Sequence, residues 1–284
     1  MPRDVTLNAL RLTVEEPAAP TRPPVLLVPG MFAGTWYFAD WQRALAARGH
    51  PAWALELRGH HPSCPVPALG RVSVAEYVED AIAAARHLGR PVVVGHSMGG
   101  LVAQKVAQAD AAQALVLVAS APPAGIPAVG AAAALRMTRY LPAMLLSQPL
   151  VPRRRDLDAI VFNRTPEAER DAIAAGYVAE SGRAARELAF GSAATRVDAP
   201  RVRCPVLVLA GGSDRFVPAR VARRLARRYG ATYREFPGMG HLLVSEPGWE
   251  TVLAHVADWL EGTRSSAGTP VAAALAAGAG ARQP

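Results

Sequence analysis

The chain is poor in cysteine, which limits the covalent chemistry open to it. Its 284 residues include only two cysteines, Cys64 and Cys204, which lie far apart and in no spacing typical of a metal site. Such cysteines are typical of reduced thiols in a cytosolic protein, not of a disulfide framework. We therefore expect a cytoplasmic location and no structural disulfide.

Long apolar runs and a secretory leader are also lacking. No stretch approaches the ~20 apolar residues that a membrane-spanning helix needs. The first four residues, Met-Pro-Arg-Asp, do not open a basic region followed by the apolar stretch of a secretory signal. These absences argue against stable membrane insertion.

Lysine is almost missing from an otherwise basic chain. Lys105 is the only lysine, so 30 of the 31 basic residues are arginine, and the formal net charge is +8. The arginines are scattered, and neither interleaved aromatic residues nor a nucleic-acid-reading motif accompanies them. The cluster at 223–228 falls on the polar face of a predicted amphipathic helix. We expect no nucleic-acid partner.

Buried strands and helices alternate over most of the chain. Apolar runs with turn residues behind them predict strands, and capped periodic segments predict helices between them. This alternation is typical of an α/β protein with a mostly parallel central sheet flanked by helices. The predicted strands are 5–14 (one strand or a short hairpin), 25–28, 52–57, 92–94, 114–119, 206–210 and 232–236, and the predicted helices are 35–48 (capped by Thr35), 74–88, 101–109, 218–229 and 247–260.

The alternation is interrupted between the strands at 114–119 and 206–210. A single crossover needs far fewer residues than this interval holds, so the segment contains structure of its own. Apolar spacing predicts helices in it at 128–141, 155–163, 166–180 and 182–191. The predicted division is a core at 1–122, a helical cap at 123–195, more core at 196–262 and a disordered tail at 263–284.

A serine follows the strand that ends near Val94. Residues 95–99 read Gly-His-Ser-Met-Gly, and a helical pattern begins directly after them. In this strand–turn–helix context, Gly-x-Ser-x-Gly places a serine on a tight, strained turn with its hydroxyl at the carboxyl edge of the sheet. We therefore interpret Ser97 as a nucleophile rather than an ordinary turn serine.

A base and an acid for this serine follow two later strands. Asp214 comes after the strand at 206–210, and His241 comes after the strand at 232–236. Both therefore lie at the edge where Ser97 lies, in the chain order Ser, Asp, His. Singly, Asp214 also fits a helix cap and His241 an ordinary loop histidine. Together the three side chains predict a nucleophile, a general base and an orienting acid.

Two backbone N–H groups are expected to bind a developing oxyanion. One belongs to Met98, directly after the serine, and the other to Met31, in the loop after the strand at 25–28. Gly30 and Gly34 allow that loop to approach a substrate closely. Simple packing of Met31 against the core is compatible with the same role.

These motifs resemble the α/β-hydrolase superfamily, in particular its capped, cofactor-free, esterase- and lipase-like members. The resemblance covers roughly residues 22–262, and two positions depart from the family pattern. Pro29 replaces the histidine that is usual in the oxyanion loop, and His61 stands where glycine commonly follows Arg-Gly-His. The residues that carry the resemblance are 28–31 (Val-Pro-Gly-Met), 57–60 (Leu-Arg-Gly-His), 95–99, 212–214 (Gly-Ser-Asp), 217–218 (Val-Pro) and 240–241 (Gly-His).

The resemblance and the chemistry together imply a serine hydrolase of carboxylic esters. The Ala-, Leu- and Met-rich cap favours a small apolar ester with a medium acyl or aromatic group. No cofactor and no metal are expected, and the pair His60–His61 is better explained by a structural turn than by a metal site. The oligomeric state stays open.

Other functions are compatible with the same residues. The fold and its serine also serve thioester, lactone and C–C bond hydrolysis and cofactor-free peroxidation. A non-catalytic small-molecule receptor is an alternative of another class. A lipid-surface enzyme would use the basic surface and the apolar cap.

Overall fold

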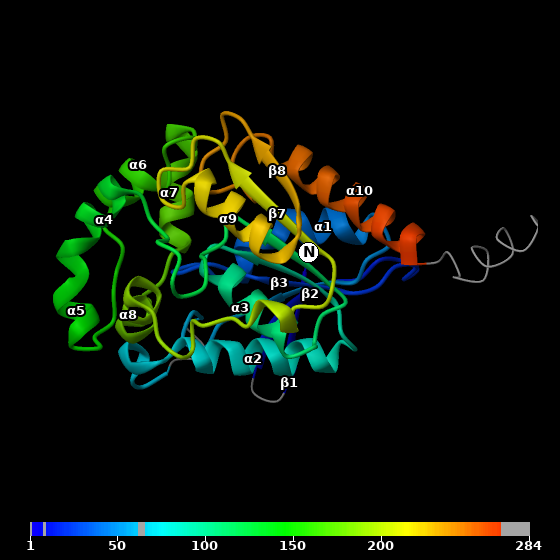
Figure 1. Ribbon diagram of the computed structural model, residues 1–284, viewed down its shortest axis with the longest axis horizontal. Coiled ribbons are helices and arrows are strands. Elements are labelled where there is room, and N and C mark those ends of the chain that lie inside the picture. The colour runs from blue at the N-terminus through cyan, green and yellow to red at the C-terminus, as the bar shows by residue number, and fades with distance from the viewer. Residues whose placement is uncertain (1, 8–9, 62–65, 268–284) are drawn as a thin grey trace, which may run out of the picture.

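The computed structural model describes residues 2–7, 10–61 and 66–267, and its centre is a twisted sheet (Figure 1). The strand order is β1-β2-β4-β3-β5-β6-β7-β8. β1 and β2 form an antiparallel hairpin at one edge, and the strands from β4 to β8 run parallel to one another. The strands are β1 (Arg3–Leu7), β2 (Leu10–Glu15), β3 (Val25–Val28), β4 (Ala52–Leu55), β5 (Val92–His96), β6 (Ala114–Val118), β7 (Val206–Gly211) and β8 (Thr232–Phe236).

Helices cover both faces of the sheet because the inner strands are apolar on both faces. On β5, Val93 packs into the cluster under α2 (Val74–His87), α3 (Met98–Gln108) and α9 (Ala219–Tyr229). The neighbouring Val94 packs into the opposite cluster, under α1 (Ala39–Ala46) and α10 (Trp249–Ala267). The predicted fold class is confirmed: the sheet is mostly parallel and lies between two helical layers.

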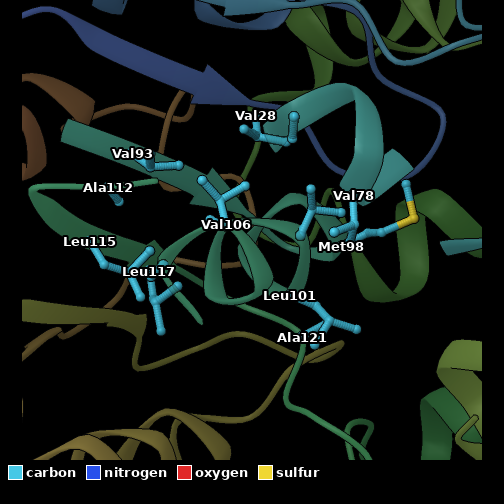
Figure 2. Packing of buried hydrophobic residues seen from close by; sticks show 14 of the residues in the cluster. Val28, Val78, Val93, Met98, Leu101, Val106, Ala112, Leu115, Leu117 and Ala121 are labelled. Atoms are coloured by element: carbon cyan, nitrogen blue, oxygen red, sulfur yellow. The ribbon is translucent and has the colours of Figure 1, made fainter. Parts of the chain in front are cut away.

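The helix α3 lies at the centre of the first cluster and begins directly behind Ser97. Figure 2 shows Val106 of α3 directed toward Val93 of β5 and Leu101 beside Ala121, while Met98 lies toward Val78 of α2. All of these α3 side chains are fully buried. Packing of this kind fixes the start of α3, and therefore Ser97, relative to the sheet.

The segment that we call the cap, residues 123–195, carries a group of helices at the carboxyl edge of the sheet, on the left in Figure 1. Its apolar spacing predicted helices correctly, but their limits differ. The predicted helix at 128–141 is divided by a 3₁₀ turn at Thr138–Tyr140, and α5 follows directly from Leu141. The cap helices are α4 (Ala131–Met137), α5 (Leu141–Leu145), α6 (Arg154–Ile160), α7 (Glu167–Gly176) and α8 (Gly182–Phe190).

Tertiary contacts explain two other differences from the predicted helices. The helix expected at 166–180 ends at Gly176, because Glu180 instead forms an isolated β-bridge with Leu150. Thr35 does not cap α1; it opens a 3₁₀ turn, and its hydroxyl donates to the carboxylate of Glu56 at 3.0 Å.

The end of the chain also differs from its prediction. α10 continues to Ala267, so residues 263–267 are helical, contrary to the predicted disordered tail. The rest of that tail, 268–284, and Cys64 lie outside the described residues, while Cys204 is a free thiol. Among the helices that the structure describes, none combines the length and the apolar character that crossing a membrane would take.

Candidate active site

Ser97 lies in the turn between β5 and α3 with a strained backbone. Its φ is 52° and its ψ is −120°, a conformation that costs a non-glycine residue about 1–3 kcal/mol. The turn is too tight for side chains at its flanks, since a Cβ at Gly99 would overlap the carbonyl oxygens of Val28 and Pro29. Two further bonds hold the turn, because the Ser97 carbonyl accepts from the amides of Gly100 and Ala121 at 2.9 and 2.8 Å.

Three buried side chains form one line of hydrogen bonds. Nε2 of His241 lies 3.0 Å from Oγ of Ser97, and Nδ1 of His241 lies 2.8 Å from Oδ2 of Asp214. The relative exposures are 6% for Ser97, 3% for His241 and 7% for Asp214, so the line is largely shielded from water. The structure therefore brings together all three side chains that the sequence singled out.

Asp214 keeps its orientation because its second oxygen is also occupied. Oδ1 accepts the amides of Phe216 at 2.8 Å and Val217 at 2.9 Å. The carboxylate thus caps the turn before α9 with one oxygen and faces His241 with the other. Since a carboxylate accepts, Nδ1 of His241 carries the hydrogen, and Nε2 is left to accept from Ser97.

His96, inside the Gly-His-Ser-Met-Gly motif, supports the loop that carries His241. Its Nε2–H donates to the backbone carbonyl of His241 at 2.9 Å, and the two rings lie 4.9 Å apart. Burial, with the charge of His241 next, lowers the pKa of His96 to about 3, so the ring is neutral near pH 7. Sequence analysis gave this histidine no role, although its place in the motif was a signal.

Glu246 holds the same loop from the other side, and no sequence signal pointed to it. Its Oε1 accepts the amide of Gly240 at 2.7 Å. Burial raises the pKa of this carboxyl to about 7, and the bond from Gly240 and the charge of His241 offset only part of that effect. A carboxyl whose pKa is raised to about 7 therefore binds Gly240, the residue before His241.

The β3 loop, residues 29–34, passes directly over Ser97. A Cβ at Gly30 would lie 3.0 Å from the Cβ of Ser97, so glycine is what permits the approach. Phe32 has a φ of 66°, a second strained position next to Met31. Met31 lies in this loop and Met98 begins α3, where the first amides of a helix have no intrahelical acceptor. Both residues line the cavities at Ser97.

The far end of this loop is attached to the turn after β4. Thr35 donates to Oε2 of Glu56 through both its amide, at 3.2 Å, and its hydroxyl, at 3.0 Å. Burial raises the pKa of Glu56, and the two Thr35 bonds act in the opposite direction. A Cβ at Gly34 would lie 2.6 Å from Oε1 of Glu56, so a larger residue there would displace that carboxylate.

Two cavities meet at Ser97, under the cap. The smaller chamber has a volume of about 60 Å³ and is lined by His241 and by residues such as Tyr37, His96, Ile160, Val161 and Tyr177. The larger chamber has a volume of about 300 Å³ and is lined by Met98 and by residues such as Ala134, Leu141, Met144, Leu188 and Val217. Met31, Ser97, Met137 and Phe216 line both, so the serine lies at the junction.

His60 belongs to a buried ion pair rather than to a group of metal ligands. Its Nε2 lies 3.2 Å from Oε2 of Glu180, and both side chains are fully buried. Within the ranges that the structure describes, three or more His, Cys, Asp or Glu side chains never gather as they would around a metal ion.

The arrangement has the parts that acyl transfer needs. A hydroxyl faces one nitrogen of an imidazole, a carboxylate lies at the other nitrogen, and Met31 and Met98 line the cavities at the hydroxyl. The site is apolar and partly closed by the cap, which strengthens each of these electrostatic contacts.

The fold and this geometry define a class of protein. The family model described as the alpha/beta hydrolase family matches residues 25–255, and the chain belongs to that family as an esterase- or lipase-like member. The family resemblance predicted from the sequence is thereby confirmed.

Individual relatives are consistent with this membership. A monoacylglycerol lipase of Mycolicibacterium smegmatis is 29% identical over 233 residues, which are 75% of this chain and 79% of that protein. The crystal structure of a Paleococcus ferrophilus monoacylglycerol lipase is 25% identical, with a TM-score of 0.70 over 88% of this chain and 98% of its own. A Thermogutta terrifontis esterase shares the fold at 23% identity, with a TM-score of 0.66 over 92% and 98% of the two chains.

Proposed function

We propose that this chain hydrolyses carboxylic esters through an acyl-enzyme on Ser97. His241 removes the serine proton as Oγ attacks the carbonyl carbon, and Asp214 orients the ring and stabilises its cation. The amides of Met31 and Met98 bind the oxyanion. His241 then protonates the leaving alcohol, and water releases the acid by the reverse steps. The line of contacts Ser97–His241–Asp214, at 3.0 and 2.8 Å, is the observation that carries this proposal.

The linings of the two chambers indicate where each half of the ester binds. His241 lines the smaller chamber, whereas Met98 lines the larger one. Because the leaving oxygen must take its proton from His241, the alcohol half belongs in the smaller chamber and the acyl half in the larger. A volume of about 300 Å³ with an apolar lining favours a medium-length acyl chain. The similarity to monoacylglycerol lipases also supports an ester whose acyl half is apolar.

The test is hydrolysis of p-nitrophenyl esters from acetate to laurate by the native chain and by Ser97→Ala. We expect turnover that peaks at medium chain length and a fall in kcat on the order of 10⁶-fold in the variant. Ser213→Ala is the matched control, because that hydroxyl contacts Arg164 instead of His241. Folded protein with no ester turnover would contradict the proposal and favour thioester, lactone or C–C bond cleavage, peroxidation, or a receptor without catalysis.

A specific observation favours a second candidate, an esterase that works at a lipid surface. The cap exposes five large apolar side chains at fractions from 63% to 74%, and one of them, Phe190, also lines the larger chamber. Exposed apolar side chains on the cap, one of them beside the acyl chamber, are suited to contact with aggregated lipid. This candidate predicts activity that rises sharply above the critical micelle concentration of the substrate, and a smooth response would exclude it. The five side chains are Leu135, Leu145, Leu146, Val151 and Phe190.

A further inference from the structure

The strained part of the β3 loop is held by two contacts from outside the loop. The carbonyl of Phe32 accepts the amide of Val178 at 2.8 Å. The carbonyl of Ala33 accepts from Nδ1 of His60 at 3.0 Å. Val178 lies in what we call the return segment, residues 177–181, between α7 and α8. These contacts act on the residues directly after Met31, whose amide is the proposed oxyanion donor.

The ring of His60 joins the β3 loop to the return segment. A carbonyl only accepts, so Nδ1 carries a hydrogen, and Nε2 lies 3.2 Å from the carboxylate of Glu180. The other Glu180 oxygen accepts from the hydroxyl of Tyr77 and from the amide of Ser181, each at 2.6 Å. Nδ1 donates to the Ala33 carbonyl, and the carboxylate of Glu180 beside Nε2 favours the imidazolium form of the ring.

The charged groups around His60 favour the same state. Burial by itself would lower the pKa of His60, but Glu180, the Ala33 carbonyl and Glu56 outweigh it and leave the pKa above its ordinary value. Burial would likewise raise the pKa of Glu180, and His60, Tyr77 and Ser181 outweigh that effect. The titratable groups that act on the pair are Glu56 and Tyr77, and around these two lie His61, beside Glu56, and Arg58 and Glu76, beside Tyr77.

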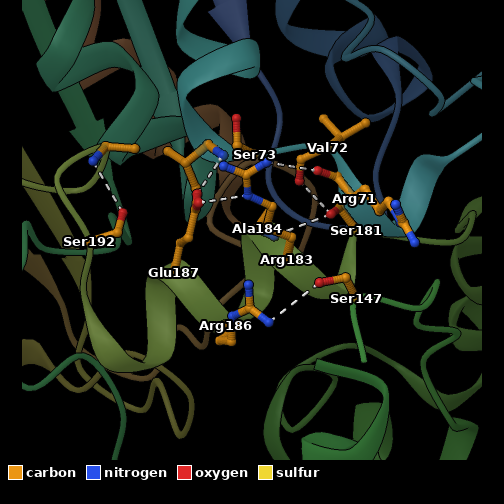
Figure 3. A network of polar contacts seen from close by, with 12 residues as sticks. Arg71, Val72, Ser73, Ser147, Ser181, Arg183, Ala184, Arg186, Glu187 and Ser192 are labelled. Carbon is orange, nitrogen blue, oxygen red and sulfur yellow. Dashed lines mark hydrogen bonds and ion pairs between the residues drawn. The ribbon is translucent and has the colours of Figure 1, made fainter. Parts of the chain in front are cut away.

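The return segment is itself fixed to the core. The hydroxyl of Ser181 lies 3.1 Å from the carbonyl of Gly70 and 2.5 Å from that of Val72. At the first residue of α2, Val74 donates its amide to Glu187 of α8 at 2.8 Å. Figure 3 shows Ser181 and Glu187 directed toward the core segment at Val72 and Ser73. Glu180 therefore lies in a segment that hydrogen bonds hold against the core.

We propose that His60, as an imidazolium paired with Glu180, is a positioning residue that holds the β3 loop so that the Met31 amide faces the oxyanion. This inference rests on the proposed function. Through its two contacts, His60 connects the return segment of the cap to the β3 loop that carries Met31. A neutral ring has one hydrogen for two acceptors. When that hydrogen stays on Nε2, beside the Glu180 carboxylate, the Ala33 carbonyl loses its donor and the strained Phe32–Ala33 backbone is freed, so turnover falls at alkaline pH.

Two amide variants separate the two contacts of His60. Asn places its side-chain nitrogen near the position of Nδ1 and keeps the bond to Ala33, whereas Gln places its nitrogen near that of Nε2 and keeps the contact with Glu180. We expect His60→Gln to lower kcat about a hundredfold with little change in KM, because the loop loses its anchor. His60→Asn should keep most of kcat at pH 7 but lose the alkaline decline. Each is also made with Glu180→Gln, so that no buried carboxylate lacks a cation.

The measurement is kcat per active site from pH 5 to 10, with sites counted by complete labelling with a fluorophosphonate. His87→Gln is the control, since His87 is exposed at the end of α2. Activity that falls only in proportion to the labelled sites, or an alkaline decline that persists in His60→Asn, would overturn the inference. A native chain that neither labels nor hydrolyses any ester overturns the proposed function, a result distinct from these.

Discussion

Ser97 and Phe32 both adopt positive φ values, of 52° and 66°, and both line the smaller chamber. Strain of this kind persists only where the surrounding structure holds the residue in place. Backbone bonds, close-packed glycines and the helix α3 hold Ser97, and the return segment with His60 holds the backbone after Met31. The hydroxyl and the Met31 amide are thus fixed before a substrate arrives, which is what electrostatic catalysis of acyl transfer requires.

The buried carboxyl of Glu246, near His241, gives a prediction about stability at the scale of one residue. Burial raises the pKa of Glu246 to about 7, whereas its value in an unfolded chain is near 4.5. The neutral form is therefore the favoured one in the folded state. Its stabilising contribution is complete below about pH 4.5 and is lost as the pH rises through about 7.

In the native chain the free energy of unfolding should therefore fall between pH 4.5 and 7. We expect Glu246→Gln to make this fall smaller by roughly 1–3 kcal/mol. The amide oxygen keeps the bond from Gly240, so the loop geometry is conserved. Urea denaturation at a series of pH values measures the effect, with Glu250→Gln at the exposed start of α10 as control. An unchanged slope in the variant would contradict the prediction.

At the scale of single elements, α2 shows how local chemistry fixes a helix that supports the site. The hydroxyl of Ser73 accepts the amide of Glu76, and the carboxylate of Glu76 accepts the amide of Ser73. This capping box satisfies two amides at the start of α2 reciprocally. α2 also carries Tyr77, which contacts Glu180, so the position of this helix matters for the cap.

Ser73→Ala should lower the free energy of unfolding by about 1 kcal/mol, because the first turn of α2 loses its cap. Ser73→Thr is the matched control, since threonine accepts the same bond. Guanidinium denaturation followed by circular dichroism gives the difference. Equal stability of the alanine and threonine variants would show that the cap contributes nothing measurable.

At the scale of the whole molecule, the cap and the core together build the two chambers. Leu188 of α8 lines the larger chamber and Val161, just after α6, lines the smaller one, while Ser97 lies between them on the core. Neither chamber exists in the core or in the cap alone. Specificity therefore depends on how the two parts are packed.

The chambers predict separate effects of two substitutions. Leu188→Trp reduces the larger volume, so kcat/KM for laurate should fall at least tenfold while that for acetate changes little. Val161→Phe reduces the smaller volume and should select against bulky alcohols with the acyl preference unchanged. Paired ester series that vary either the acyl or the alcohol half measure both effects. A variant that shifts both series alike would contradict the assignment of the halves.

Leu188→Ala controls for simple disruption of the cap, because it enlarges the same chamber. It should preserve acetate hydrolysis and favour acyl chains longer than those that suit the native protein. Loss of activity on every ester in this variant would show that the side chain supports the fold rather than the acyl group.

The sequence by itself determined the sheet, the flanking helices and the places of Ser97, Asp214 and His241. The reason is that these signals are local: apolar strands stop at turn residues, and carboxyl ends of parallel strands meet at one edge. Knowledge of the strand order was not needed to place the three side chains at that edge. The helix limits in the cap were less certain, because Glu180 leaves the predicted helix for a bridge with Leu150.

Only the tertiary structure decided which polar groups support these residues and where a substrate fits. His96 and the His241 carbonyl are 145 positions apart, and Tyr77 and Glu180 are 103 positions apart. No periodicity or turn signal connects such pairs, since their contact depends on how whole elements pack. The same holds for the raised pKa of Glu246 and for the chambers, which arise from burial and from the fit of the cap on the sheet.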